Sequence, residues 1–490
     1  MYASKWILSV IIVSGFISGT SIHAKVIADS RNTAKQLTTI GDALNAPDHH
    51  PIHVLYVHGI DEIGSGDSAT FRNSICTKLN LCNVADWKNA GVEFPDKGEF
   101  APGAQPPSLQ YLGNPIWNNA DEWAASAPFV VHWVVHLRNH PSVLVVDELN
   151  WWPLIMALKC RRIVAAEPRM AGPSKDLLQV CSEASRQNPD GLGHFYPWIA
   201  PDQAKQLAAI KPRGALVNRT LKGTLVDWGL ADVVLVVGPL GGILRDGLRQ
   251  LMSESAAFDP NGPASPADDA RERYDWHTQW QRGNTPGYKI DQEFVGITHS
   301  LGSYLLFNTL SLLPAGVAER GLTDPESARN ANEDRALEYI FERTSLLYFF
   351  ANQLQMLEVT NLEYGSGTQT NAMQPVQSSA IPSAATAPIA NFRALVHRWQ
   401  VIQSGFEAGT HPNDESARKT IQVVAWSDPS DVLTWRVPRI GDVDVINLFV
   451  QNAPHWFWLL ETPTKAHSGY ACNKDVLHYM FRTTRPEKEH

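Results

Sequence analysis

Residues 294–310 have the sequence FVGITHSLGSYLLFNTL, and this stretch decides the fold. It begins with a short apolar run that predicts a buried strand and continues, from Leu301 on, with apolar side chains at helical spacing. Ser300 lies on the tight turn between these two elements, and Gly302 follows two residues later. Such a turn strains the serine backbone and directs the hydroxyl away from the sheet.

The pentapeptide from Thr298 to Gly302 resembles the nucleophile elbow of the α/β-hydrolase superfamily. Small residues flank the serine in that motif, because strand and helix pass close together there. Thr298 stands where the family has glycine. A serine at this position can also serve only to cap the first turn of a helix. With a strand before it and a helix after it, we predict that Ser300 is a nucleophile.

An earlier apolar run, Ile52 to Val57, predicts another buried strand. It ends in His-Gly-Ile, and α/β-hydrolases form half of their oxyanion hole just after such a strand; the second donor is the N–H of the residue after the nucleophile. The resemblance implies that the donors are Ile60, or alternatively Gly59, and Leu301. A His-Gly pair can also be a plain flexible strand exit.

A late strand, residues 421–426, is followed by two candidate acids, Asp428 and Asp431. The family places its acid after the nucleophile in the chain and before the histidine. Asp431 precedes two apolar residues, a pattern common at this position, and is favoured as the triad acid. Asp428 is the alternative acid, although Asp before Pro429 also serves to set up a turn.

His467 lies in the sequence AHSGY shortly before the final predicted helix. This region resembles the one in lipase-like and esterase-like members that presents the catalytic base on a loop before the last helix. We therefore predict that His467 is the base. His455, which lies beside aromatic residues, and His478, within the final helix, are the competing candidates.

The resemblance covers the chain from about residue 52 to 480. It implies a single α/β-hydrolase domain over 25–490, with a mostly parallel central sheet and helices on both faces. Residues 161–226 have mixed periodicity and form a candidate cap or lid insertion, since long connections in such folds are often functional. Residues 365–388 are poor in charge and rich in Ser, Thr, Gln, Ala and Pro, which predicts a mobile loop.

The 490 residues are 44% hydrophobic and 19% charged, as in a folded globular protein. A net charge of -9 disfavours nucleic acid as a partner.

His132 and His136 are four residues apart, a spacing that suits two metal ligands on a helix, but no third ligand is near; packed or surface histidines are favoured. We expect no metal, no cofactor, and a small-molecule or lipid ester as substrate.

The first 24 residues combine a basic start, a short apolar centre and a terminal alanine, which is typical of a secretory signal peptide. The apolar centre is short for a transmembrane span, so we expect no stable span after cleavage and a secreted or periplasmic protein. An uncleaved amino-terminal anchor is the alternative. The cysteines agree with export. Four of them, Cys76, Cys82, Cys160 and Cys181, permit three pairings that the sequence does not separate; local pairs are favoured, with Cys472 left unpaired.

Together these motifs predict an exported serine hydrolase that cleaves carboxylic esters through an acyl-enzyme intermediate. The same three side chains also serve amidases, thioesterases and acyltransferases. A second alternative is a non-catalytic binding module on the same scaffold, because Thr298 departs from the family motif. Fold alone does not choose among them, since function lies in the site.

Overall fold

The computed structural model describes residues 39–46, 50–59, 68–94, 104–111, 114–160, 231–260, 292–311, 336–358, 421–437, 443–452 and 463–483, with a few single positions left out, and also 27–28, 100, 181 and four positions from 202 to 209. The predicted signal segment 1–24 and loop 365–388 lie outside these residues. So does the predicted insertion 161–226, apart from the positions just named.

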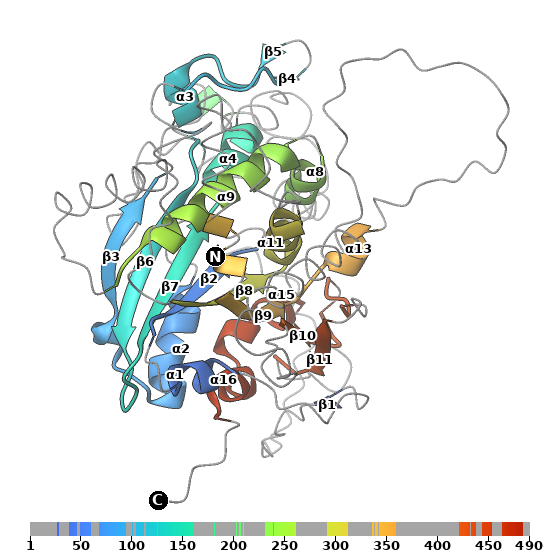
Figure 1. Cartoon of the computed structure of the whole chain (residues 1–490). Helices are drawn as coiled ribbons and strands as arrows, with labels where there is room; N and C mark the ends of the chain where they lie inside the picture. The colour runs from blue at the N-terminus through green and yellow to red at the C-terminus, as the bar shows by residue number, and fades with distance from the viewer. Residues whose placement is uncertain are drawn as a thin grey trace, which may run out of the picture.

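A mixed sheet forms the centre of the structure (Figure 1). Its strand order is β1-β11-β10-β9-β8-β2-β7-β6-β3. The six neighbouring strands from β11 to β7 are all parallel, whereas β1, β6 and β3 pair antiparallel at the edges. The strands are β1 Ile27–Ala28, β2 Ile52–Val57, β3 Lys88–Glu93, β6 Phe129–His136, β7 Val143–Asn150, β8 Glu293–His299, β9 Thr344–Phe350, β10 Gln422–Ser427 and β11 Asp444–Phe449.

The helices divide between the two faces of this sheet. One face is covered by α9 (Gly241–Ala257) and α11 (Leu301–Ser311), and the other by α1 (Ile40–Leu44), α2 (Ala69–Leu79) and α16 (Lys474–Phe481), which lie together (Figure 1). The chain also forms α3 Ala120–Ala124, α4 Trp152–Leu158, α8 Ala231–Val237, α13 Leu354–Glu358, α15 Pro463–Ser468, the short 3-10 helices Val84–Asp86 and Tyr470–Cys472, and a small hairpin of β4 Gln110–Tyr111 and β5 Asn114–Pro115. The fold is therefore of the predicted α/β class.

The period-2 pattern of the strands explains the two layers of core. In β2, Leu55 and Val57 join one buried cluster, whereas Val54 and Tyr56 join the other. Successive side chains of a strand point to opposite faces, so a strand covered on both sides must be apolar along its whole length. All six residues of β2 are buried.

His132 and His136, which the sequence favours as packed or surface histidines, lie on a strand and not on a helix. Residues 129–136 form strand β6, where four-residue spacing does not create the helical ligand pair considered from sequence. His132 is fully buried instead, with Nδ1 2.6 Å from Asp147, and His136 is exposed. The described ranges contain no group of three or more His, Cys, Asp or Glu placed to hold a metal ion.

Asp147 also accepts from Nδ1 of His53, at 2.8 Å, so one buried carboxylate serves two imidazoles. Burial lowers the pKa of His132, but hydrogen bonding to Asp147 and the charges of Asp147 and Glu93 outweigh it and raise the pKa to about 9. The His132 ring also stacks on Phe258, with centroids 4.0 Å apart. The histidine is therefore a protonated, packed core residue.

Both predicted disulfides are present, Cys76–Cys82 and Cys160–Cys181, and Cys472 is a free thiol. Local pairing is confirmed at each. Among the helices of the described ranges, none combines the length and hydropathy needed to cross a bilayer.

Candidate active site

Ser300 occupies the junction between β8 and α11, as the sequence predicts. Its φ is +52°, a left-handed conformation that is costly for a residue with a side chain. The Ser300 N–H donates to the carbonyl of Phe350, the last residue of β9, at 2.8 Å. The adjacent strand thus helps to hold the strained turn in place.

Close packing around the elbow explains the two glycines. A Cβ on Gly302 would lie 2.5 Å from the carbonyl oxygens of Val57 and His58. A Cβ on Gly59 would lie 2.9 Å from both the Ser300 Cβ and the His299 Nδ1. Helix α11 therefore starts directly against the end of β2, as the motif requires.

Thr298 is accommodated by hydrogen bonding. Its hydroxyl lies 2.8 Å from the Ser303 Oγ and 3.4 Å from the Tyr348 carbonyl. The side chain is fully buried and pairs with the first turn of the helix that follows. Threonine in place of glycine is thus compatible with the elbow geometry in this protein.

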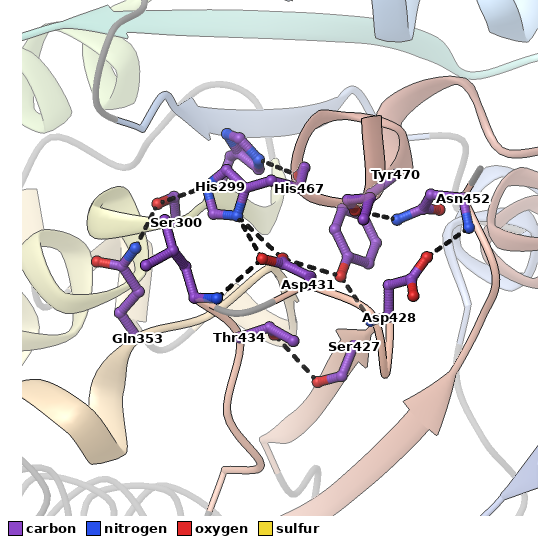
Figure 2. Close-up of polar contacts among 12 residues, drawn as sticks. His299, Ser300, Gln353, Ser427, Asp428, Asp431, Thr434, Asn452, His467 and Tyr470 are labelled. Atoms are coloured by element: carbon purple, nitrogen blue, oxygen red, sulfur yellow. Dashed lines mark hydrogen bonds and ion pairs between the residues drawn. The ribbon is translucent and has the colours of Figure 1, made fainter. Parts of the chain in front are cut away.

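His467 contacts Ser300 through one ring nitrogen and Asp431 through the other (Figure 2). The Nε2–Oγ distance to Ser300 is 3.0 Å, and Nδ1 lies 2.9 Å from Asp431 Oδ2 and 3.1 Å from Oδ1. A carboxylate can only accept, so Nδ1 carries the proton and Nε2 is free to accept from the serine hydroxyl. Three residues distant in sequence thus form a continuous hydrogen-bonded chain.

The histidine lies on a short helix rather than on the loop expected from sequence. Helix α15 begins at Pro463 and includes His467. Proline is well suited to the first helical position, because it has no N–H to satisfy and its φ is already helical. His467 therefore comes from an ordered helix, and its side chain is 16% exposed. Of its competitors, His478 lies exposed on α16, and His455 lies outside the described residues.

Asp428, the alternative acid, does not contact His467 in this structure. Its two carboxylate oxygens accept the backbone N–H groups of Ser430, at 2.9 Å, and Asn452, at 2.6 Å. Asn452 in turn donates its side-chain amide to the Ala466 carbonyl at 2.7 Å. Asp428 thus links the loop after β10 to the segment just before His467.

Tyr470 connects the two aspartates (Figure 2). Its hydroxyl accepts from the Asp428 N–H at 2.6 Å and lies 3.4 Å from Asp431 Oδ2. Burial, then the negative charge of Asp431, raise its pKa well above the usual value, so the phenol stays protonated and can donate to the carboxylate. Asp431 Oδ1 also accepts the Leu433 N–H at 3.0 Å.

His299 holds the backbone of His467 from the other side. Its Nε2 lies 2.8 Å from the His467 carbonyl oxygen, so Nε2 must carry the proton and donate. The two rings are 5.0 Å apart between centroids. With Asn452 on the Ala466 carbonyl, two consecutive backbone groups of α15 are held by side chains from other elements.

Of the predicted oxyanion donors, Leu301 is the first residue of α11 and is fully buried. The first N–H groups of a helix have no partner within the helix, which suits them to bind negative charge. Ile60 lies outside the described residues. The alternative donor, Gly59, lies against Ser300. The ring of the preceding His58 stacks on Trp151, which follows β7, with centroids 4.8 Å apart.

Gln353 also contacts Ser300, although no motif in the sequence predicts it. It lies just beyond β9, is 1% exposed, and its Nε2 is 2.9 Å from the Ser300 Oγ. Its position three residues past an apolar run is the only sequence signal, because parallel strands bring their carboxyl ends to one edge of the sheet. The same edge carries Ser300 after β8 and Asp431 after β10.

Comparison with protein-family models, with curated proteins and with solved structures finds no match to this chain.

Proposed function

We propose that this protein is a serine hydrolase of the α/β-hydrolase superfamily that cleaves carboxylic esters through an acyl-enzyme intermediate. One observation carries the proposal: the His467 ring joins Ser300 Oγ, at 3.0 Å, to Asp431 Oδ2, at 2.9 Å. A serine hydroxyl is a weak nucleophile until a neutral imidazole takes its proton. The elbow motif and the order serine, aspartate, histidine along the chain support the same superfamily.

In the proposed reaction, Ser300 Oγ attacks the ester carbonyl while its proton moves to His467 Nε2. Asp431 holds the ring in the required tautomer and stabilises the imidazolium. The N–H of Leu301, with that of Ile60 as the second proposed donor, binds the negative charge on the carbonyl oxygen. Losing one such donor typically costs about 10²–10³ in rate.

The intermediate then collapses, the C–O bond to the alcohol breaks, and His467 gives its proton to the departing oxygen. Water next attacks the acyl-Ser300 ester, again losing a proton to His467. That proton returns to Ser300 Oγ as the acid leaves. Two cycles of proton transfer thus use the same nitrogen, which requires the ring to stay fixed by Asp431 and by its backbone contacts to His299 and Asn452.

A fluorophosphonate probe tests the nucleophile directly, because it reacts only with an activated serine. We expect stoichiometric labelling of the wild type and none of Ser300→Ala. Ser303→Ala is the matched control, since Ser303 is also buried on α11 but bonds to Thr298. A folded wild type that does not react would leave the non-catalytic binding module as the better description.

Matched ester, thioester and amide substrates with one acyl group test the reaction class. We expect the ester to give the highest kcat/KM. Faster cleavage of the thioester or amide, or transfer of the acyl group to added alcohol in preference to water, would replace the ester hydrolase with one of the alternatives.

We also propose that the protein is exported to the periplasm or secreted. The two disulfides support this, because such bonds persist in oxidising compartments. Fractionation of cells that express the full chain should place the protein outside the cytoplasm, shortened by residues 1–24. Retention of the full-length chain in the membrane fraction would favour the uncleaved anchor.

A further inference from the structure

Gln353 donates to the nucleophile and holds its hydroxyl toward His467. The Ser300 Oγ gives its hydrogen to His467 Nε2, so it accepts from Gln353 Nε2, at 2.9 Å. Figure 2 shows the two side chains approaching Oγ from different sides. The oxygen of the same carboxamide, Oε1, is buried and has no hydrogen-bond partner among the described residues.

The backbone around Gln353 is fixed. Ala351 has φ +49°, a costly conformation for alanine, and its N–H donates to the Trp426 carbonyl at 3.2 Å. Asn352 binds the backbone of Trp435 through both its side-chain amide and its carbonyl. Gln353 accepts the Leu357 N–H at 3.0 Å. The backbone that carries the Gln353 side chain is therefore held from both sides, and the contact to Ser300 places its carboxamide.

A buried acceptor without a donor is unfavourable, so a ligand that donated a hydrogen bond to Oε1 would be stabilised there. Other buried glutamines, such as Gln292, also have an unpaired amide oxygen. Among the described glutamines, Gln353 is the one whose amide nitrogen contacts Ser300 Oγ. Since the two ends of a carboxamide are close together, its oxygen also lies near Ser300 Oγ, the atom that would carry the acyl group.

The geometry separates the two parts of an ester. The leaving alcohol must lie near His467 Nε2, which gives it a proton, and His467 is the partly exposed member of the site, at 16%. Gln353 approaches Ser300 from another side and is buried. We therefore place the acyl part of the substrate, which stays bonded to Ser300, beside Gln353.

We infer that Gln353 selects acyl groups with a hydrogen-bond donor, a hydroxyl or an N–H, on the first carbons beyond the carbonyl. This inference rests on the proposed serine hydrolase function and names its substrate class. The donor binds Gln353 Oε1 while Nε2 keeps Ser300 in place. Sites built to hydrogen-bond a substrate group discriminate against analogues that lack it, because the protein partner is then left unpaired.

The test compares p-nitrophenyl esters of butanoate, 2-hydroxybutanoate and 3-hydroxybutanoate with the two methoxy counterparts. A methoxy group has an oxygen of similar position but cannot donate. We expect the kcat/KM of at least one hydroxy ester to exceed that of its methoxy counterpart by about 10-fold in the wild type. Equal values for both pairs would overturn the inference.

Variants assign the preference to Gln353. Gln353→Met keeps the side-chain length without donor or acceptor, and the hydroxy-to-methoxy ratio should fall to about 1. Gln353→Glu keeps acceptor oxygens but cannot donate to Ser300 when ionised, so it should lower kcat for all esters while retaining the preference. Gln292→Met is the matched control: Gln292 donates to the Phe258 carbonyl at 2.9 Å, at the far end of β8, and its loss should leave the ratio unchanged.

Fluorophosphonate labelling separates a failure of the inferred acyl selection from a failure of the proposed serine hydrolase function. If Ser300 is labelled but the wild type shows no preference, or if Gln353→Met keeps it, the acyl selection is wrong and the serine hydrolase stands. If folded wild type is neither labelled nor active, both fail together.

Discussion

His467 Nδ1 lies 2.9 Å from one oxygen of Asp431, whose carboxylate is almost fully buried. Asp428, three residues earlier, accepts hydrogen bonds from two backbone N–H groups instead. The sequence pattern favours Asp431, and the structure gives the two acids different contacts. One orients the imidazole, and the other fixes the segment that carries it.

This difference predicts unequal effects of two matched substitutions. Asp431→Asn should lower kcat by about 10⁴, because an amide at this position favours the wrong tautomer of the histidine. Asp428→Asn should lower kcat much less and mainly reduce stability, by about 1–3 kcal/mol, since backbone N–H groups lose a charged acceptor. Ester hydrolysis and urea unfolding of both variants measure this, and the reverse ranking of kcat would identify Asp428 as the triad acid.

The substitution Tyr470→Phe removes one hydroxyl group and keeps the aromatic ring. The ring, which stacks on Phe350 with centroids 5.9 Å apart, remains in place. The Asp428 N–H loses its acceptor and Asp431 loses a donor. We expect the free energy of unfolding to fall by about 1–3 kcal/mol in urea titrations. An unchanged unfolding midpoint would show that these contacts contribute nothing to stability.

The buried His132 predicts a loss of stability at alkaline pH. Its pKa is about 9 in the folded protein, against 6.5 for an unperturbed histidine. A raised pKa means that the folded state binds the proton more tightly. The contribution is therefore complete below about pH 6.5 and disappears as pH rises through about 9.

The measurement is the free energy of unfolding between pH 6 and pH 10, for the wild type and His132→Phe. The wild type should lose a few kcal/mol across this interval. The variant removes the titrating group and should be less stable at pH 6 but show a weaker pH dependence. Parallel curves would mean that His132 does not carry the effect.

Substitutions of disulfide-bonded and free cysteines should differ in their effect on stability. Cys160→Ser with Cys181→Ser should cost about 3 kcal/mol, because the crosslink closes a loop of 21 residues. Cys472→Ser should be close to neutral, since serine can still donate to the Gly469 carbonyl that the thiol contacts at 3.3 Å. Thermal unfolding compares them. The oxidised, unfolded wild type should show one reactive thiol per chain.

Local sequence was sufficient for the parts of this protein that local physics controls. The apolar run, Ser300 and Gly302 predict a strand, a strained turn and a helix, because periodicity and close packing are properties of neighbouring residues. The same applies to β2 and β10, whose continuous apolar stretches indicate burial on both faces. The order of candidate nucleophile, acid and base could also be read along the chain.

The tertiary structure decided which of these residues meet. His467 and Ser300 are 167 positions apart, and their contact depends on strand order and on how the last helices return to the sheet. Asp431 and Asp428 follow the same strand, and the tertiary structure brings Asp431 to His467 and Asp428 to two backbone N–H groups. Gln353 had no motif at all: it reaches the serine because β9 lies beside β8, and the pairing of distant parallel strands is not encoded in any short stretch of sequence.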